Sequence, residues 1–276
     1  MDKQTAIYVT LNWIAVFLYV VATTANVAGI IFSKRTLEQR SYWPAAAALV
    51  VHGAAIGHWW RIVGHGPYMA PSEVLSSDAW VTMAAFMVFI RIYPRIRPAS
   101  ILVFPATFLM LALANMYNPG IRSLPTTFGS VWLIFHIAFY KIALATLVIA
   151  FAFSVFVLLK QRQCQAEWLN KLPDTNTVDL YAYRFAGFGF IFWAIAMLAG
   201  SIWAYRSWGR YWGWDPVETW SLLTWLLFGV YLHLRHFFRW DGQRAAWFYI
   251  ACFLISLVSI FITSHMGSSI HAEYFK

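Results

Sequence analysis

Apolar residues along this chain are gathered into eight long runs separated by short polar segments. The runs cover residues 7–32, 42–60, 79–90, 101–116, 131–159, 185–205, 220–234 and 245–262. A helix that crosses a membrane needs roughly 20 apolar residues. The third and fourth runs are shorter, and tilting, or extension by Trp80 and Tyr93 at their ends, would bring them to this length. The pattern predicts an all-α, polytopic integral membrane protein with about eight transmembrane helices and short loops.

Composition supports this prediction and excludes several classes of protein. Of the 276 residues, 61% are apolar and only 11% are charged, and the mean hydropathy is +0.60. Soluble domains carry about 25% charged residues, so a soluble enzyme, a nucleic-acid-binding module and a disordered tail are all excluded. Eight helices leave little sequence for anything else, and we therefore expect residues 1–276 to form a single membrane domain.

The distribution of basic residues predicts the orientation. When the loops between the eight runs are numbered in order, thirteen Lys and Arg residues lie in odd loops, against six in the even loops and the two termini. Basic loops stay on the cytoplasmic side of a membrane. Both termini and the even loops are therefore expected on the external, periplasmic side.

The chain lacks the residue patterns of several common catalytic and metal sites. Its two cysteines, Cys164 and Cys252, are far apart and form no C-x-x-C motif, so a disulfide framework, a structural zinc site and dithiol chemistry are not expected. The sequence shows no nucleophile–base pair, no phosphate-binding glycine loop and no paired carboxylates. We predict no catalytic residue of its own.

The histidines fall at two depths of the predicted helices. Four of them lie at or near predicted external helix ends: His65, His136, His265 and His271. His52 and His233 lie well inside predicted spans. Ionisable side chains within a bilayer are costly and point to function, although a single intramembrane histidine can also simply hydrogen-bond to a neighbouring helix. Because imidazole is a usual axial ligand of haem iron, two levels of histidine favour a haem-binding role.

Residues 203–225 form a segment that is unusually rich in tryptophan. It reads WAYRSWGRYWGWDPVETWSLLTW and holds six indole side chains: Trp203, Trp208, Trp212, Trp214, Trp220 and Trp225. The predicted topology places it as an external loop between the sixth and seventh spans. An aromatic belt at the membrane surface explains part of this enrichment, but a flat apolar shelf for a porphyrin explains its density better.

The two acids in this segment also have a structural explanation. Asp215, Pro216 and Glu218 fit the start of a helix, with Asp215 as the N-cap, proline at the first position and Glu218 closing a capping box. The sequence alone therefore leaves open whether these carboxylates only begin a helix or also serve a ligand.

The stretch WGRYWGWDPVET, residues 208–219, resembles the tryptophan-rich "WWD" motif of haem-handling proteins of cytochrome c biogenesis. Its continuation, TWSLLTWLLFGVYLHLR, is most similar to the CcsA (ResC) branch. The segment GHGP at residues 64–67, followed by Glu73, resembles an early external segment of the family, although Met69 and Ala70 stand where Ser-Asn is usual. Residues 269–274 resemble the family's C-terminal GLHSY segment loosely. The resemblance runs from about residue 45 to residue 276.

The resemblance implies a set of haem-binding residues at the external side. His136 and His271 match the two histidines that flank the WWD loop and ligate haem, with His265 as the competitor for His271. The aromatic shelf and its acid would be Trp208, Trp212, Trp214 and Asp215. The haem would be haem b, handled as cargo rather than as a resident cofactor.

A second, intramembrane haem position is implied by His233, which matches a family histidine near the cytoplasmic end of the helix after the motif. Its partner ligand would come from a CcsB (ResB)-type subunit, or within this chain from His52. Gly53 and Gly57 beside His52 form a G-x-x-x-G pattern, which close helix packing also explains.

The implied function is haem transport, and presentation of haem on the external side for covalent attachment to the C-x-x-C-H motif of an apocytochrome c. Such a chain would be the haem-handling subunit of a cytochrome c synthase in the bacterial inner membrane, rather than a stand-alone enzyme. Three alternatives remain open: a CcmF- or CcmC-type haem handler, a b-type electron-transfer membrane protein, and a small-molecule permease with a Trp-lined cavity.

Overall fold

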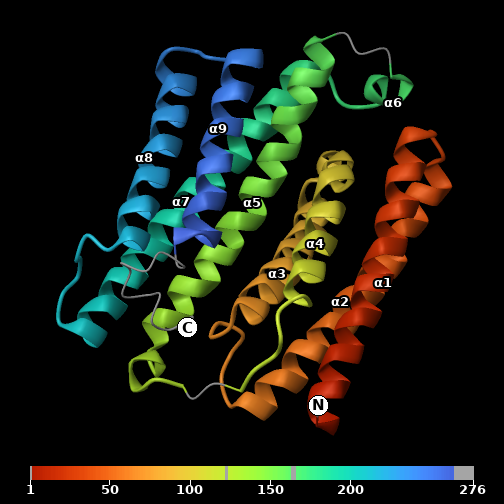
Figure 1. Cartoon of the computed structure of the whole chain (residues 1–276). Helices are drawn as coiled ribbons and strands as arrows, with labels where there is room; N and C mark the ends of the chain where they lie inside the picture. Colours follow the sequence, from red (N-terminus) through yellow and green to blue (C-terminus); the bar gives the residue numbers. More distant parts are fainter. Residues whose placement is uncertain (1, 122–123, 163–165, 264–276) are drawn as a thin grey trace. The chain divides into compact units, whose positions relative to one another are not determined.

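The computed structural model describes residues 2–121, 124–162 and 166–263. All secondary structure in these residues is helical, which confirms the predicted fold class. The chain divides into two compact units, the first comprising Met1–Leu124 and Gln165–Pro173 and the second Pro125–Cys164 and Asp174–Lys276 (Figure 1). Each unit packs its own set of helices, and the single membrane domain expected from the sequence stays a prediction.

The first unit is built from four long helices and shorter elements. They are α1 (Lys3–Ile31), α2 (Arg35–Val63), α3 (Pro71–Ile92), the 3-10 turn η1 (Pro94–Ala99), α4 (Ser100–Ala114) and α6 (Glu167–Asn170). Helix α1 packs along α2 and α4, and α3 packs along α4. At the turn between the first two helices, Gly29 lies against the backbone of Glu38, where a Cβ atom would come within 2.4 Å of the Glu38 nitrogen.

The second unit is organised around one central helix. It contains η2 (Thr126–Phe128), α5 (Val131–Gln161), α7 (Thr175–Trp208), α8 (Pro216–Phe237) and α9 (Gly242–Phe261) (Figure 1). Of the most apolar stretch of α5, 78% is buried inside the protein, because α7 and α9 both pack along it. Helix α8 packs on α7 and α9, and only 22% of its most apolar stretch is buried.

Each of the eight predicted apolar runs corresponds to a long helix, but several helices begin earlier than the run does. Helix α7 starts at Thr175, ten residues before its run, because Asp174 caps it. The Asp174 carboxylate accepts hydrogen bonds from the backbone N–H and the hydroxyl of Thr177, and these bonds hold the pKa of Asp174 below its usual value. Polar first turns are invisible to a search for apolar runs, since capping depends on a few polar residues.

Within the described residues, seven helices are long and apolar enough to cross a membrane. Helix α2 is as long as α1 but carries Arg35, Glu38 and Arg40 in its first turns, and it is not one of the seven. The helices indicate a multi-pass membrane protein. The number of spans and the external location of both termini stay predictions.

Candidate functional site

The tryptophan-rich segment is less of a loop than the sequence predicted. Helix α7 continues to Trp208 and ends at Gly209, whose φ of +71° is a left-handed cap that glycine adopts readily. Helix α8 begins at Pro216, so the connection is only residues 209–215. Trp212 and Trp214 lie in this connection, whereas the other four tryptophans of the segment lie on the two helices.

The predicted capping box at the start of α8 is confirmed. The Asp215 carboxylate accepts a hydrogen bond from Val217 N at 2.9 Å, and Pro216 occupies the first helical position. Glu218 Oε2 accepts from Asp215 N at 3.3 Å and from Gly213 N at 2.7 Å. The second of these bonds lies outside a simple capping box and draws the connection over the first turn of α8.

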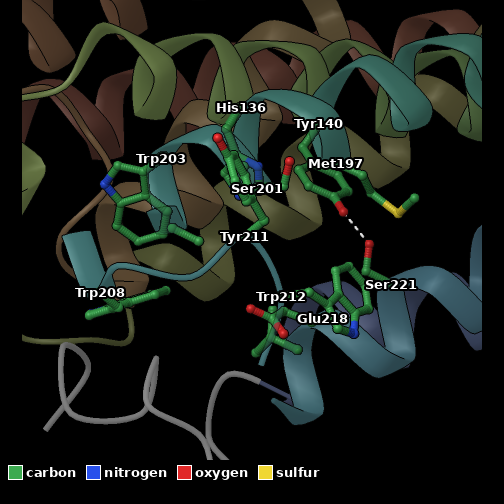
Figure 2. A pocket seen from close by; sticks show the side chains of 13 residues that line it. His136, Tyr140, Met197, Ser201, Trp203, Trp208, Tyr211, Trp212, Glu218 and Ser221 are labelled. Atoms are coloured by element: carbon green, nitrogen blue, oxygen red, sulfur yellow. Dashed lines mark hydrogen bonds between the residues drawn. The ribbon is translucent and has the colours of Figure 1, made fainter. Parts of the chain in front are cut away.

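A pocket opens beside this connection, entirely within the second unit. The space not filled by atoms at this pocket, which is partly open to solvent, is about 440 Å³, and Figure 2 shows the side chains around it. The lining residues include His136 and Tyr140 from α5, Met197, Trp203 and Trp208 from α7, Tyr211 and Trp212 from the connection, and Glu218 and Ser221 from α8. The lining is mainly apolar and rich in aromatic rings, with few polar groups, as is usual for a site that binds an apolar organic ligand.

Aromatic contacts join the histidine of this pocket to the tryptophan-rich segment. The ring of His136 is stacked on Trp203 at 6.3 Å between centroids, and Trp203 meets Trp208 edge to face at 4.9 Å. The Trp203 indole N–H donates to the carbonyl of Thr127 at 2.9 Å. The connection is held against α7 by the stacked rings of Tyr205 and Tyr211, 4.4 Å apart.

The orientation of His136 is set by a hydrogen bond to α7. Its Nδ1 lies 2.9 Å from the carbonyl oxygen of Ala196, and because a carbonyl only accepts, Nδ1 carries the hydrogen. In a neutral ring this tautomer puts the lone pair on Nε2. A metal-binding histidine is usually oriented in this way, with its other nitrogen donating to a backbone carbonyl.

Beneath His136, a hydrogen-bonded network joins three helices. The Tyr140 hydroxyl hydrogen-bonds to the Ser221 hydroxyl (Figure 2), and the indole N–H of Trp193 donates to the same Ser221 oxygen at 3.0 Å. The Tyr140 ring meets His136 edge to face at 4.9 Å. Since these residues come from α5, α7 and α8, the network fixes the floor of the pocket.

The predicted aromatic shelf is only partly assembled at the pocket. Trp208 and Trp212 line it. The Trp212 indole nitrogen is buried and has no hydrogen-bond partner among the described residues. Trp214 does not line the pocket: its side chain is 71% exposed and its φ is +59°, a left-handed conformation that costs a non-glycine residue about 1–2 kcal/mol. Asp215 is buried in its capping role.

His52 lies in the core of the first unit. Its Nε2 is 2.8 Å from the Ser76 hydroxyl and its Nδ1 is 3.5 Å from the hydroxyl of Tyr19. These contacts explain a buried histidine without a ligand. Gly53 next to it accommodates the indole of Trp80, while a Cβ at Gly57 would meet nothing within 4 Å, so the G-x-x-x-G pattern does not bring two helix backbones together here.

His233 lies on the outward face of α8. It is exposed and packs against Phe237, with 4.5 Å between ring centroids. Since α8 begins at Pro216, four residues before the apolar run 220–234, His233 stands about 26 Å along the helix at 1.5 Å per residue. His265 and His271, the candidates for the second external ligand, lie outside the described residues.

The segment at residues 64–73, which leads from α2 into α3, forms a buried polar cluster in the first unit. The Glu73 carboxylate accepts from the indole N–H of Trp59 at 2.9 Å and from the backbone N–H groups of Met69 and Ala70. His65 donates from Nδ1 to the carbonyl of Gly66 at 2.8 Å. Glu73 therefore holds the turn between α2 and α3 in place.

Several residues of the pocket were not predicted as site residues. Tyr140 and Ser221 line the pocket with His136, and Trp193 contacts both of them, only because α5, α7 and α8 pack together. Trp203, which stacks on His136, was marked only by its place in the tryptophan-rich segment. Gly200, whose absent side chain makes room for the His136 ring, carries no signal in a single sequence.

Comparison with known proteins gives the family. Residues 95–271 match the family described as "Cytochrome C assembly protein". The chain belongs to this family. The predicted resemblance is confirmed, and the protein is a multi-pass integral membrane member of this family. The matched region contains α5, α7, α8 and the pocket between them.

Relatives of this member of the cytochrome c assembly family carry the description "Cytochrome c biogenesis protein CcsA". That of Chlamydomonas reinhardtii is 31% identical over 222 residues, which cover 78% of this chain and 63% of the relative, so this chain spans less than two thirds of it. That of Guillardia theta is 26% identical over 268 residues, or 88% of this chain and 89% of the relative. That of Prochlorococcus marinus (strain MIT 9312) is 28% identical over 240 residues and covers 77% of each chain.

A solved structure, described as "Cytochrome c Heme Lyase CcmF", has the same fold. The match covers 100% of this chain and 49% of that one, with a TM-score of 0.70 and 14% sequence identity. At this level of identity the match supports the helical architecture, while the chemistry rests on the residues described above.

Proposed function

We propose that this chain binds haem b in the pocket beside His136 and presents it for covalent attachment to the C-x-x-C-H motif of an apocytochrome c. The observation that carries the proposal is the His136 imidazole, which Ala196 fixes in one tautomer and which stands in a pocket lined by Trp203, Trp208 and Trp212. Haem is the cargo of this reaction, and its vinyl groups take up the two thiols of the apocytochrome.

The residues of the pocket fit a porphyrin. Aromatic walls suit a large planar apolar molecule, and one imidazole suits an iron whose equatorial ligands come with the porphyrin. No group of three His, Cys, Asp or Glu side chains in the described part of the chain is arranged to hold a bare metal ion. The unpartnered indole N–H of Trp212 offers a hydrogen bond to an anionic oxygen, such as a propionate.

The chain's own residues bind and orient the cargo. Trp203, Trp208 and Trp212 exclude water from it, and His136 supplies one axial ligand. Glu218 holds the connection over the pocket through Gly213. Arg206 lies over the ring of Trp132, which favours an anchoring role for it rather than a contact with the cargo.

The second external ligand is assigned by the family resemblance. We propose His271, and His265 is the alternative. In purified protein, His271→Ala should lose the spectrum of two-imidazole ligation, and His265→Ala should keep it. The reverse result assigns the ligand to His265.

We further propose that His233 is one ligand of an intramembrane haem position, with the other ligand supplied by a CcsB-type subunit. Leu223, Leu226, Val230 and Phe237 share its outward face on α8 and are exposed. An imidazole on such an apolar face is costly in lipid, so a protein partner that covers it is favoured. The site of action is the bacterial inner membrane, and the chain acts as a subunit of a cytochrome c synthase.

The test is the absorption spectrum of the protein purified from membranes together with its partners. We expect a Soret band that is greatly reduced in His136→Ala and partly restored by free imidazole, which can fill an empty axial position. His58→Ala is the control, because His58 lies in the first unit and contacts the carbonyl of Gln4. A haem-free wild-type protein, as expected of a permease, or an unchanged His136→Ala spectrum, would contradict the proposal.

A further inference from the structure

One turn of α7 makes an unusually close contact with the His136 ring. The carbonyl of Ala196 accepts the Nδ1–H of His136 at 2.9 Å. Gly200 stands one turn further along, and a Cβ atom at this position would lie 2.4 Å from His136 Nδ1 and 2.7 Å from Cε1. Distances this short do not occur for real Cβ atoms, so any side chain at position 200 would displace the imidazole.

The two contacts depend on each other through helix geometry. In an α-helix, the carbonyl of residue 196 already accepts the N–H of residue 200, and it keeps a second lone pair for another donor. Side chains tilt towards the helix N-terminus, so a side chain at position 200 would lie over that carbonyl. Because position 200 is glycine, the carbonyl of Ala196 stays accessible to a ring from α5.

We infer that Ala196 and Gly200 are positioning residues for His136, which set the tautomer of its ring and the direction of its Nε2. This inference rests on the proposed function, in which Nε2 ligates the iron. Gly200 leaves room for the imidazole ring because it has no side chain, and Ala196 supplies the carbonyl that accepts its Nδ1–H. Two residues of α7 thus orient an iron ligand that belongs to α5. Gly200 also lines the pocket, but its positioning role is exerted through His136.

Two other glycines of α7 provide matched controls. Gly189 is also at the interface with α5, and a Cβ there would lie 2.5 Å from the Leu147 Cδ2 atom, away from His136. Gly187 faces open space, with nothing within 4 Å of its Cβ position. The three Gly→Ala variants therefore share the same change in helix propensity. They differ in what the new methyl group meets: His136, a leucine or nothing.

The experiment measures haem per protein and the axial-ligand spectrum in the purified wild type, in Gly200→Ala, Gly189→Ala and Gly187→Ala, and in His136→Ala. Partner residues of a metal-binding histidine typically change metal affinity by roughly 10- to 100-fold. We expect a loss of this order for Gly200→Ala, together with the spectral change of His136→Ala and partial recovery with free imidazole. Gly187→Ala, and the part of the Gly189→Ala protein that folds, should keep the wild-type spectrum and show no response to imidazole.

The outcomes separate this inference from the proposed function. If His136→Ala loses its axial ligand while Gly200→Ala keeps the wild-type spectrum, the inference is wrong and the function stands. If Gly200→Ala loses haem without recovery in imidazole, and Gly189→Ala does the same, position 200 matters only for packing and the inference is again wrong. An unchanged spectrum in His136→Ala overturns both.

Discussion

The carboxylate of Glu218 accepts a hydrogen bond from the backbone N–H of Gly213 at 2.7 Å, across the start of α8. The same oxygen also accepts from Asp215 N. One acidic side chain thus fixes both the helix start and the course of the connection that carries Trp212.

The first prediction follows from this arrangement. Glu218→Ala should lower the thermal unfolding temperature and weaken haem retention, since a hydrogen bond to a charged group contributes about 1.5–3 kcal/mol. Asp215→Asn is the control, because Asn caps a helix as well as Asp does, and it should be nearly silent. Differential scanning calorimetry of the purified proteins measures the unfolding temperature, and their absorption spectra measure the haem content. A severe Asp215→Asn effect would indicate that this carboxylate acts on the cargo.

The second prediction separates stacking by Trp212 from hydrogen bonding. Trp212→Ala should weaken haem binding by about 1–3 kcal/mol, because it removes a buried aromatic wall. Trp212→Phe keeps an aromatic ring and removes only the unpartnered N–H, so its loss should be smaller, about 1 kcal/mol. Haem titration of the apoprotein measures both. Equal losses in the two variants would mean that the N–H carries the whole contribution.

The third prediction concerns Trp214, which is exposed and has a positive φ. Trp214→Gly should be tolerated at least as well as Trp214→Ala, because glycine adopts this conformation without strain. Both variants should retain more haem than Trp212→Ala does, since the Trp214 ring does not line the pocket. If Trp214→Ala and Trp214→Gly lose as much haem as Trp212→Ala, the indole moves onto the cargo when it binds.

The fourth prediction concerns haem supply through His233. His233→Ala should lower haem occupancy at the His136 pocket in cells, because less haem reaches that pocket. Added imidazole should partly restore the occupancy, because it can replace the missing His233 ligand while the ligands of the pocket remain in place. His236→Ala is a matched control: His236 is also exposed, three residues further along α8. Full occupancy in the His233→Ala protein would show that this side chain serves packing against Phe237 alone.

The fifth prediction concerns an ion pair that fixes α8 to α7. Arg235 donates two hydrogen bonds to the Asp179 carboxylate, at 2.8 and 2.5 Å, and both side chains are largely buried. Asp179→Asn leaves a buried guanidinium unpaired and should destabilise the fold by about 3 kcal/mol. Asp174→Asn, at the exposed cap of the same helix, should change stability little. Thermal unfolding of the two variants measures the difference. Equal effects would mean that the ion pair contributes no more to stability than the exposed helix cap does.

The sequence by itself determined the helices and the capping of α8. A long apolar run that crosses a membrane folds as a helix, because a helix makes the backbone hydrogen bonds within the run itself. The order Asp215, Pro216 and Glu218 begins a helix through local hydrogen bonds. Such features depend on residues close together in the chain, so a pattern reveals them. The tryptophan-rich motif likewise pointed to the correct family.

Only the tertiary structure decided what surrounds His136. The carbonyl of Ala196, the space left by Gly200 and the ring of Trp203 reach it from a helix about 60 residues away in the chain. The tertiary structure also placed Trp212 at the pocket and Trp214 at the surface, although the two are separated by a single residue. The reason is physical: the direction of a side chain follows from backbone dihedral angles and from the packing of distant helices, and neither is written in the local order of residue types.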